Sequence, residues 1–271
     1  MLAVILPQAE DKLLEALLFQ KNKDFKVYIR KGEQINEDFE TKLNLVNGTV
    51  SDVQEPILCI LESGAVPDKN FVKRILHTTS KHPEFAVYLM NIAGGKNLPR
   101  STKGAKLFRL AVQDNVNMPL SSFVFRTEQF RDNAKFLPGG GLNLLPTVLS
   151  CTRHTPIRKI WRQTLQWTTP PVPESGLKEE RSIREKLDLY KWSEDFFGDE
   201  NYPLSVSEQM ELFAKEVAKL YPIRSAEEIK EMMKEFKCAQ GPIRKIRAAQ
   251  ALKSALKERE KLQNSVQETV D

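Results

Sequence analysis

The triplet Glu62-Ser63-Gly64 is the part of this sequence best suited to chemistry, because it ends an apolar run, residues 57–61, just before a helical pattern. A carboxylate at the carboxyl end of a buried strand stands where open α/β sheets bind their ligands. Carboxylate oxygens suit hard divalent cations such as Mg²⁺ or Mn²⁺, whose remaining ligands can come from phosphate. We therefore interpret Glu62 as a candidate metal and phosphate-site residue. A carboxylate that caps the following helix is the alternative.

The elements that must position this triplet begin with a β-α-β pattern. Leucines recur at helical spacing over residues 10–19, and a second helical pattern covers residues 68–79. Strand-like runs are residues 2–6, 25–29, 57–61, 85–90, 106–112 and 121–126. Because strands linked through helices run in the same direction, we expect a mainly parallel sheet with flanking helices.

The composition indicates a globular protein with one or two domains. The chain has 271 residues, 41% hydrophobic and 28% charged, and no stretch approaches the ~20 apolar residues of a membrane-spanning helix. Residues 168–176 are rich in Pro and predict a linker. We therefore expect an α/β domain over residues 1–167 and an all-α domain over residues 177–271, where helix-forming residues dominate.

The helical part carries its own boundary signals. Residues 205–208 and 225–228 both have the Ser-x-x-Glu form of an N-terminal capping box. Residues 142–151 form another helical pattern after three glycines, and Gly241-Pro242 predicts the start of the last helix.

Cysteine usage and the first residues bear on location. Cys59, Cys151 and Cys238 match neither a disulfide framework nor a zinc spacing. We therefore expect a reducing cytoplasm, that of the host if the chain is viral. Residues 1–7 lack a basic segment and predict a first strand rather than a signal peptide.

Over residues 1–167, the order of these parts resembles the GT-A-fold nucleotide-sugar glycosyltransferases, especially those of family 2. In that family the strand in the place of residues 57–61 ends in an acidic Asp-x-Asp-type motif. Residues 123–126, followed by Phe130 and a Gly turn, look like the acceptor-side strand of the family. Residues 163–167 resemble its Gln-x-x-Arg-Trp motif, with packing of Trp161, Leu165 and Trp167 over a hydrophobic edge as the alternative.

The resemblance implies a GT-A-like fold and a nucleotide-sugar donor, with a UDP-sugar favoured. It places Glu62, Ser63 and Gly64 in the donor site and implies Mn²⁺ or Mg²⁺ held by Glu62. Gly64 stands where the family has its second acid, and residues 30–32 lack the acid that contacts the uracil ring. No carboxylate stands at residues 142–144, where the family has its catalytic base. Asp132 and Glu128 are the nearest substitutes, with a role as surface charges as the alternative.

Clustered cations are candidates for phosphate contacts in a chain whose formal net charge is +5. A Gly-rich loop can wrap a diphosphate, and it carries Lys96, Arg100 and Lys103. Candidate nucleic-acid contacts lie next to Trp161 and at the start of the last helix: Arg158, Lys159, Arg162, Arg244, Lys245 and Arg247. For each group a solvated surface is the alternative.

The sequence therefore predicts a glycosyltransferase that moves a sugar from a nucleotide-sugar donor to a hydroxyl acceptor. One acceptor class is a hydroxymethylated base in DNA, as in DNA-modifying phage glycosyltransferases, and the other is a glycan or lipid-linked saccharide. Two alternatives stay open at this point. One is a non-catalytic GT-A-like scaffold, and the other is a generic α/β nucleic-acid-binding protein.

Overall fold

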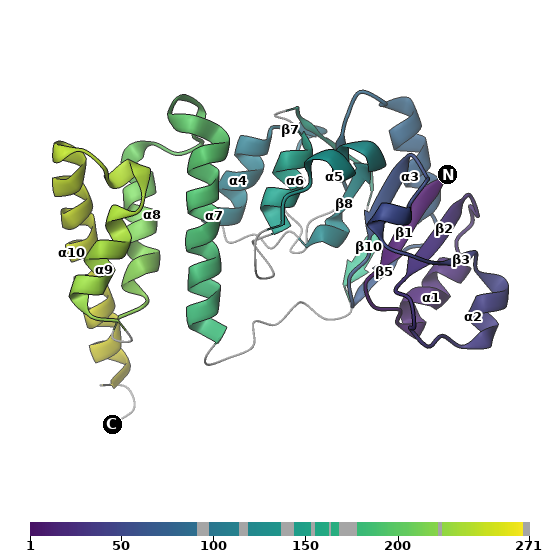
Figure 1. Cartoon of the computed structure of the whole chain (residues 1–271), viewed down its shortest axis with the longest axis horizontal. Helices are drawn as coiled ribbons and strands as arrows, with labels where there is room; N and C mark the ends of the chain where they lie inside the picture. The colour runs from purple at the N-terminus through teal and green to yellow at the C-terminus, as the bar shows by residue number, and fades with distance from the viewer. Residues whose placement is uncertain are drawn as a thin grey trace. The chain divides into compact units, whose positions relative to one another are not determined.

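A computed structural model describes most of the chain. The described residues are 1–90, 98–113, 119–136, 144–152, 155–162, 164–167, 178–221 and 224–267. The chain divides into two compact units, Met1–Val172 and Pro173–Asp271 (Figure 1). This division falls inside the stretch predicted as a linker, residues 168–176, which lies outside the described residues.

The first unit contains a mixed, mainly parallel sheet, which confirms the fold class expected from the sequence. Across the described residues, the order of its eight strands is β3-β2-β1-β4-β8-β6-β9-β7. The strands β3, β2, β1 and β4 run parallel to one another, whereas β8 runs antiparallel to both β4 and β6. In chain order the strands are β1 (Leu2–Leu6), β2 (Phe25–Ile29), β3 (Leu45–Asn47), β4 (Ile57–Ile60), β6 (Val87–Leu89), β7 (Ser101–Thr102), β8 (Phe123–Arg126) and β9 (Ile157–Lys159).

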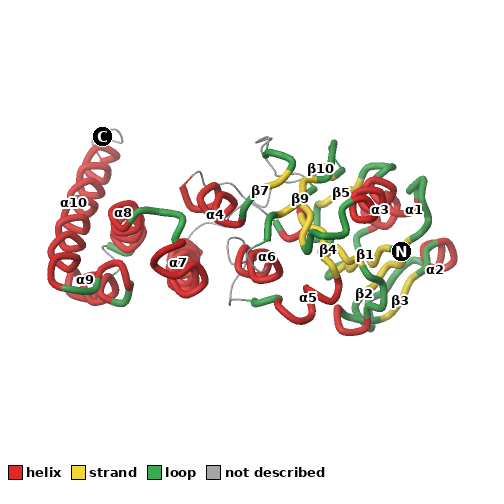
Figure 2. The backbone as a smooth tube through the Cα atoms, turned by 90° about the horizontal axis from the view of Figure 1, so that it is seen from above, coloured by secondary structure: helices red, strands yellow, loops and turns green. Residues whose placement is uncertain are grey.

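Helices cover both faces of this sheet (Figure 2). Leu2, Val4 and Leu6 alternate along β1 and share one buried cluster with the apolar residues of α1 (Asp11–Leu18), α2 (Glu37–Lys42) and α3 (Phe71–Lys81). On the other face, α5 (Thr127–Asn133) sets the ring of Phe130 against Phe125 of β8, with 4.9 Å between the ring centroids. Figure 2 shows α1 and α3 on one side of the central strands and α5 on the other.

The expected strand over residues 106–112 is wrong, because this segment belongs to the helix α4 (Gly104–Gln113). Leu107, Phe108, Ala111 and Val112 are buried, a spacing that also suits one face of a helix. The helix packs on α6 (Leu145–Thr152) so closely that a Cβ at Gly104 would lie 2.9 Å from Leu149 Cδ2. The packing on α6 therefore decides between the strand pattern and the helix pattern of this segment.

The second unit is helical, as expected. It contains α7 (Lys178–Asn201), α8 (Val206–Ala218), α9 (Ala226–Lys234) and α10 (Pro242–Gln267). Both predicted capping boxes are confirmed, at Ser205 and Ser225. Its core includes the rings of Tyr190, Phe213 and Phe236, with centroid distances of 4.7 and 4.3 Å between neighbours. Within the described ranges, no helix has the length and apolar content needed to cross a membrane.

A buried carboxylate connects two strands that are not neighbours in the sheet. Glu55, just before β4, forms an ion pair of 2.9 Å with Lys26 and accepts a hydrogen bond of 2.7 Å from the Tyr28 hydroxyl. Both partners belong to β2, and β1 lies between β2 and β4. Burial favours the neutral acid, but the contacts with Lys26 and Tyr28 outweigh it and hold the pKa of Glu55 below its ordinary value.

We expect Lys26→Met to lower the melting temperature at pH 7, because it leaves the Glu55 carboxylate buried without its cation. In the wild type the depressed pKa contributes stability that is present above the unfolded pKa and lost as the pH falls through the folded pKa. Without Lys26, burial raises the pKa of Glu55, and protonation at lower pH then favours the folded state. The deficit of the variant should therefore shrink as the pH falls from 7 toward 5.

Thermal unfolding of both proteins across this pH range is the measurement. Lys42→Met is the matched control, since its partner Asp38 is exposed and such surface pairs contribute little. A deficit that stays constant with pH would contradict the account.

Candidate functional site

The candidate site lies at the carboxyl ends of three adjacent parallel strands. Parallel pairing of β2, β1 and β4 brings their carboxyl ends to one edge of the sheet, where the Leu61 amide donates to Ile5 O at 2.9 Å. Three carboxylates follow these strand ends: Glu10 after β1, Glu33 after β2 and Glu62 after β4. All three therefore begin at the same edge of the sheet.

Glu62 is held by Ser121, which lies in a short 3-10 turn before β8. The Glu62 amide donates to Ser121 Oγ at 2.7 Å, and the Ser121 amide and hydroxyl donate to Glu62 Oε2 at 3.1 and 2.9 Å. The alternative role of Glu62 as a helix cap is wrong, because α3 begins only after Asn70. Glu62 Oε1 accepts no hydrogen bond from the part of the chain that the structure describes, so it is available to a ligand.

Glu10 closes the turn that follows Glu62. Its carboxylate accepts from the Ser63 hydroxyl and, at 3.3 Å, from the Gly64 amide. Gly64 has a φ of +78°, a left-handed conformation that favours glycine over any residue with a Cβ. This backbone requirement explains why glycine stands in the place of a second acid.

Glu33 is an acid that follows the second strand directly after residues 30–32, where no acid stands. Gly32, with a φ of +86°, turns the chain so that the Glu33 amide donates to Arg30 O at 3.2 Å. The Glu33 carboxylate then accepts from the Ala9 amide at the end of β1 through Oε1. Its Oε2 is buried and has no hydrogen-bond partner among the described residues. Sequence reasoning missed both Glu10 and Glu33; Gly32, a turn former, was the available signal for Glu33.

The other half of the same edge carries aromatic and cationic side chains. Because β6 and β9 run in the same direction as β4, the residues after β9 lie at the edge where Glu62 lies. Trp161 is 63% exposed there, with the Arg100 guanidinium 5.5 Å from its ring centroid. Next to it, Arg162 has a φ of 73°, the one positive value of a non-glycine residue in the described ranges. Such backbone outliers are concentrated at functional sites.

A small second sheet connects the two halves. The strand β10 (Leu165–Trp167) pairs antiparallel with β5 (Ala65–Pro67), which begins directly after Gly64. Leu165 is fully buried, which agrees with the packing interpretation. Trp161 is exposed, which disagrees with it. Gln163 lies outside the described residues.

The structure describes Arg100 and Lys103 of the Gly-rich loop. Lys103 is exposed next to the start of α4, and Arg100 O accepts from the Lys159 amide at 2.9 Å. Lys96 lies outside the described residues. The role of this loop in binding a diphosphate stays a prediction.

The two candidate bases are on α5, which follows β8. The end of β8 pairs with Ile57, at the opposite end of β4 from Glu62, and the Thr127 amide there donates to Pro56 O at 3.1 Å. Glu128 therefore starts at the far edge of the sheet, and Asp132 lies farther along the helix; both are exposed. No hydrogen bond or ion pair among the described residues joins either one to Glu62.

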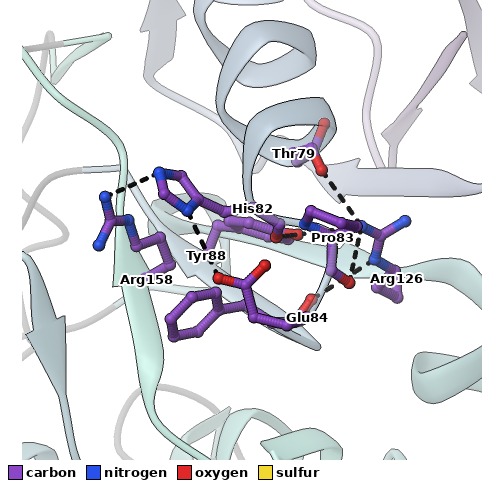
Figure 3. A network of polar contacts seen from close by, with 8 residues as sticks. Thr79, His82, Pro83, Glu84, Tyr88, Arg126 and Arg158 are labelled. Atoms are coloured by element: carbon purple, nitrogen blue, oxygen red, sulfur yellow. Dashed lines mark hydrogen bonds and ion pairs between the residues drawn. The ribbon is translucent and has the colours of Figure 1, made fainter.

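Arg158 takes part in a polar network at the start of β6 (Figure 3). Its guanidinium lies 2.8 Å from His82 Nε2, and because a guanidinium only donates, this nitrogen is the acceptor. His82 Nδ1 then carries the hydrogen that faces Glu84 Oε1 at 3.4 Å. Arg158 is therefore engaged within the protein, in contrast to exposed Arg162.

Arg126 fastens the end of α3 to the start of β6 in the same network (Figure 3). Its guanidinium donates to three backbone carbonyls and to the Tyr88 hydroxyl: Thr79 O at 3.2 Å, Pro83 O at 3.0 Å, Phe85 O at 3.4 Å and Tyr88 at 3.2 Å. This arginine has a structural role, since all its acceptors belong to the scaffold.

In the second unit, the predicted nucleic-acid contacts Arg244, Lys245 and Arg247 are exposed at the start of α10. No described group of three or more His, Cys, Asp or Glu residues could hold a metal ion. Glu62 Oε1 nevertheless fits a divalent cation that takes its other ligands from a diphosphate and water, as Mg²⁺ often does.

No family model and no curated protein sequence matches this chain. Its structure is similar to residues 1–349 of S. aureus TarS, with a TM-score of 0.53 at 12% identity over 96% of this chain and 91% of that chain. The same fragment in complex with UDP-GlcNAc matches with a TM-score of 0.55 at 12% identity over the same shares of both chains. A longer S. aureus TarS structure matches with a TM-score of 0.57 at 13% identity, over 94% of this chain and 55% of that chain. These similarities establish a fold like that of the GT-A nucleotide-sugar glycosyltransferases.

We expect Ser121→Ala to lower the free energy of unfolding by about 1–2 kcal/mol, because the Glu62 amide and carboxylate both lose their bond to the hydroxyl. Ser122→Ala is the matched control. Ser122 is equally buried, but its hydroxyl lacks a hydrogen-bond partner among the described residues, so its loss should cost little. Urea denaturation measures both values, and equal losses would contradict the bridging role of Ser121.

We expect Arg126→Lys to lower the free energy of unfolding by about 1–3 kcal/mol, because a lysine cannot reproduce the fork of donors that reaches four acceptors. Arg131→Lys, at an exposed position of α5, is the control and should change little. Urea denaturation again gives both values. A neutral Arg126→Lys would show that these bonds do not hold α3 to β6.

Proposed function

We propose that this protein is a nucleotide-sugar glycosyltransferase whose donor binds at the carboxyl ends of β1, β2 and β4. The observation that carries the proposal is that Glu10, Glu33 and Glu62 follow the carboxyl ends of β1, β2 and β4, and that Glu10 accepts hydrogen bonds from the Ser63-Gly64 turn after Glu62. Open α/β sheets bind nucleotides in this position. The complex of the TarS fragment with UDP-GlcNAc supports a UDP-sugar as the donor.

The two free carboxylate oxygens suit different parts of such a donor. Glu33 Oε2 is buried without a described partner, and a buried acceptor of this kind needs a donor. We assign it to an N–H group of the nucleotide base, for which the uracil imide is the simplest match. Glu62 Oε1 would hold a divalent cation together with the diphosphate, and that cation would stabilise the negative charge of the leaving group.

We place the acceptor at the other half of the edge, against Trp161, Arg100 and Arg162. An exposed indole offers a flat apolar surface to a sugar or base ring, and the guanidinium groups suit an anionic acceptor. Transfer to a hydroxyl requires a base within hydrogen-bonding reach of it. We propose Asp132 for this role, with Glu128 as the second choice. Asp132 comes first because α5 begins at the opposite end of β4 from Glu62, and Asp132 lies farther along this helix than Glu128.

The acceptor is either a glycan or lipid-linked saccharide or, as in phage DNA modification, a hydroxymethylated base in DNA. Exposed Arg162 and Arg100 are compatible with both, since both classes can carry phosphate. Lys159 and Arg158 add less to a nucleic-acid surface, because Lys159 Nζ donates to Leu98 O at 3.3 Å and Arg158 is engaged with His82. Transfer of labelled sugar to each acceptor class separates the two.

A non-catalytic scaffold is the second candidate. It is favoured by Gly64 in place of the second acid and by the engagement of Glu62 Oε2 with Ser121. A scaffold that retains the donor site would bind the nucleotide but would neither transfer the sugar nor hydrolyse the donor slowly.

We expect UDP-GlcNAc with Mn²⁺ to raise the melting temperature by about 3 °C or more at a concentration near ten times its dissociation constant. Glu62→Gln keeps an acceptor for Ser121 but removes the charge, so the metal-dependent part of this shift should disappear. Glu15→Gln is the control, since Glu15 is exposed on α1. A thermal-shift titration with and without Mn²⁺ measures these effects.

The absence of any shift with UDP, GDP, CDP and their sugars would overturn the proposal. A shift without release of free sugar or transfer to any acceptor would favour the scaffold. If donor hydrolysis occurs, Asp132→Asn should lower its rate without changing the thermal shift.

A further inference from the structure

The first turns of α10 protrude from the helical unit. All residues from 241 to 247 are exposed, whereas the helix is packed from Ala248 onward, with Leu252 and Ala255 buried and α8 in contact. Ile243 and Ile246 are 69% and 62% exposed. Residues three apart lie on the same face of a helix, so the two isoleucines form one apolar spot in water.

Three cations lie in the same turns. At the helical spacing of 3.6 residues per turn, Arg247 flanks the isoleucine face, and Arg244 and Lys245 lie toward the opposite face. Arg244, Lys245 and Arg247 make no side-chain hydrogen bond or ion pair with any described residue. They also occupy the beginning of the helix, where the helix dipole disfavours positive charge. A partner that uses both the cations and the isoleucines would explain why they occur together.

We infer that residues 242–247, the α10 entry turn, dock on an anionic lipid surface. An interfacial helix inserts apolar side chains at the boundary of the acyl chains while its cations stay among the lipid phosphates. Nucleic acid would use the three cations but would leave the isoleucines without a role. The inference concerns the second unit alone and is independent of the proposed donor site.

The test is co-sedimentation of the full chain with phosphatidylcholine vesicles, with and without phosphatidylglycerol. We expect binding to the anionic vesicles that weakens with salt, and little binding to the neutral ones. The double variant Ile243→Ser/Ile246→Ser keeps every charge and should weaken binding at least roughly tenfold, because two apolar side chains no longer leave water.

Charge is tested with a matched pair of triple variants. Arg244→Gln/Lys245→Gln/Arg247→Gln should remove the dependence on anionic lipid and salt. Lys253→Gln/Lys257→Gln/Lys261→Gln lowers the net charge equally at exposed positions farther along α10 and should retain most of the binding. All altered side chains are exposed, so circular dichroism and the thermal shift with UDP-GlcNAc should stay as in the wild type.

Two results would overturn the inference. One is the absence of binding to anionic vesicles at low salt. The other is binding that survives in the isoleucine variant and is matched by salt-dependent affinity for duplex DNA, which would assign the cations to nucleic acid. Because neither result involves the donor site, failure here is distinguishable from failure of the proposed function.

Discussion

The parallel register of β2, β1 and β4 is the constraint on which the rest of this structure depends. It places three strand ends at one edge, and the segments that follow them therefore meet there. Glu10, Glu33 and Glu62 each accept backbone N–H groups or serine donors from a neighbouring segment. The site is thus built from the same hydrogen bonds that complete the strand ends. Among the described residues, Glu62 Oε1 and Glu33 Oε2 accept no hydrogen bond.

The antiparallel strand β8 joins the half of the sheet formed by β3, β2, β1 and β4 to the half formed by β6, β9 and β7. Ser121, in the turn just before this strand, is hydrogen-bonded to Glu62, and the last residue of the strand, Arg126, holds α3 and the start of β6. On the face covered by α5, the Glu55 cluster connects β2 to the chain before β4. Polar contacts therefore connect the elements at both ends of the central strands, and the apolar core lies between them. The candidate site is thus built on packed strands and turns.

Much of the fold could be predicted from local patterns, because apolar periodicity and capping chemistry act within a few residues. The strands near residues 2–6, 25–29 and 121–126 and the capping boxes at Ser205 and Ser225 were found in this way. The helix α4 was missed, since its buried positions fit two periodicities and its packing on α6 decides between them. Glu62 was found at a strand end, whereas Glu10 and Glu33 were missed because their partners lie 54 and 24 residues away in sequence.

By itself, the sequence determined the class of the fold, the position of Glu62 and the helical character of the second unit, since each follows from short-range pattern and residue chemistry. Only the tertiary structure decided which carboxylates share an edge, which arginines are engaged within the protein and which apolar residues of α10 stay in water. These properties depend on contacts between segments distant in sequence. Such contacts arise from strand register and packing, and no local pattern contains them.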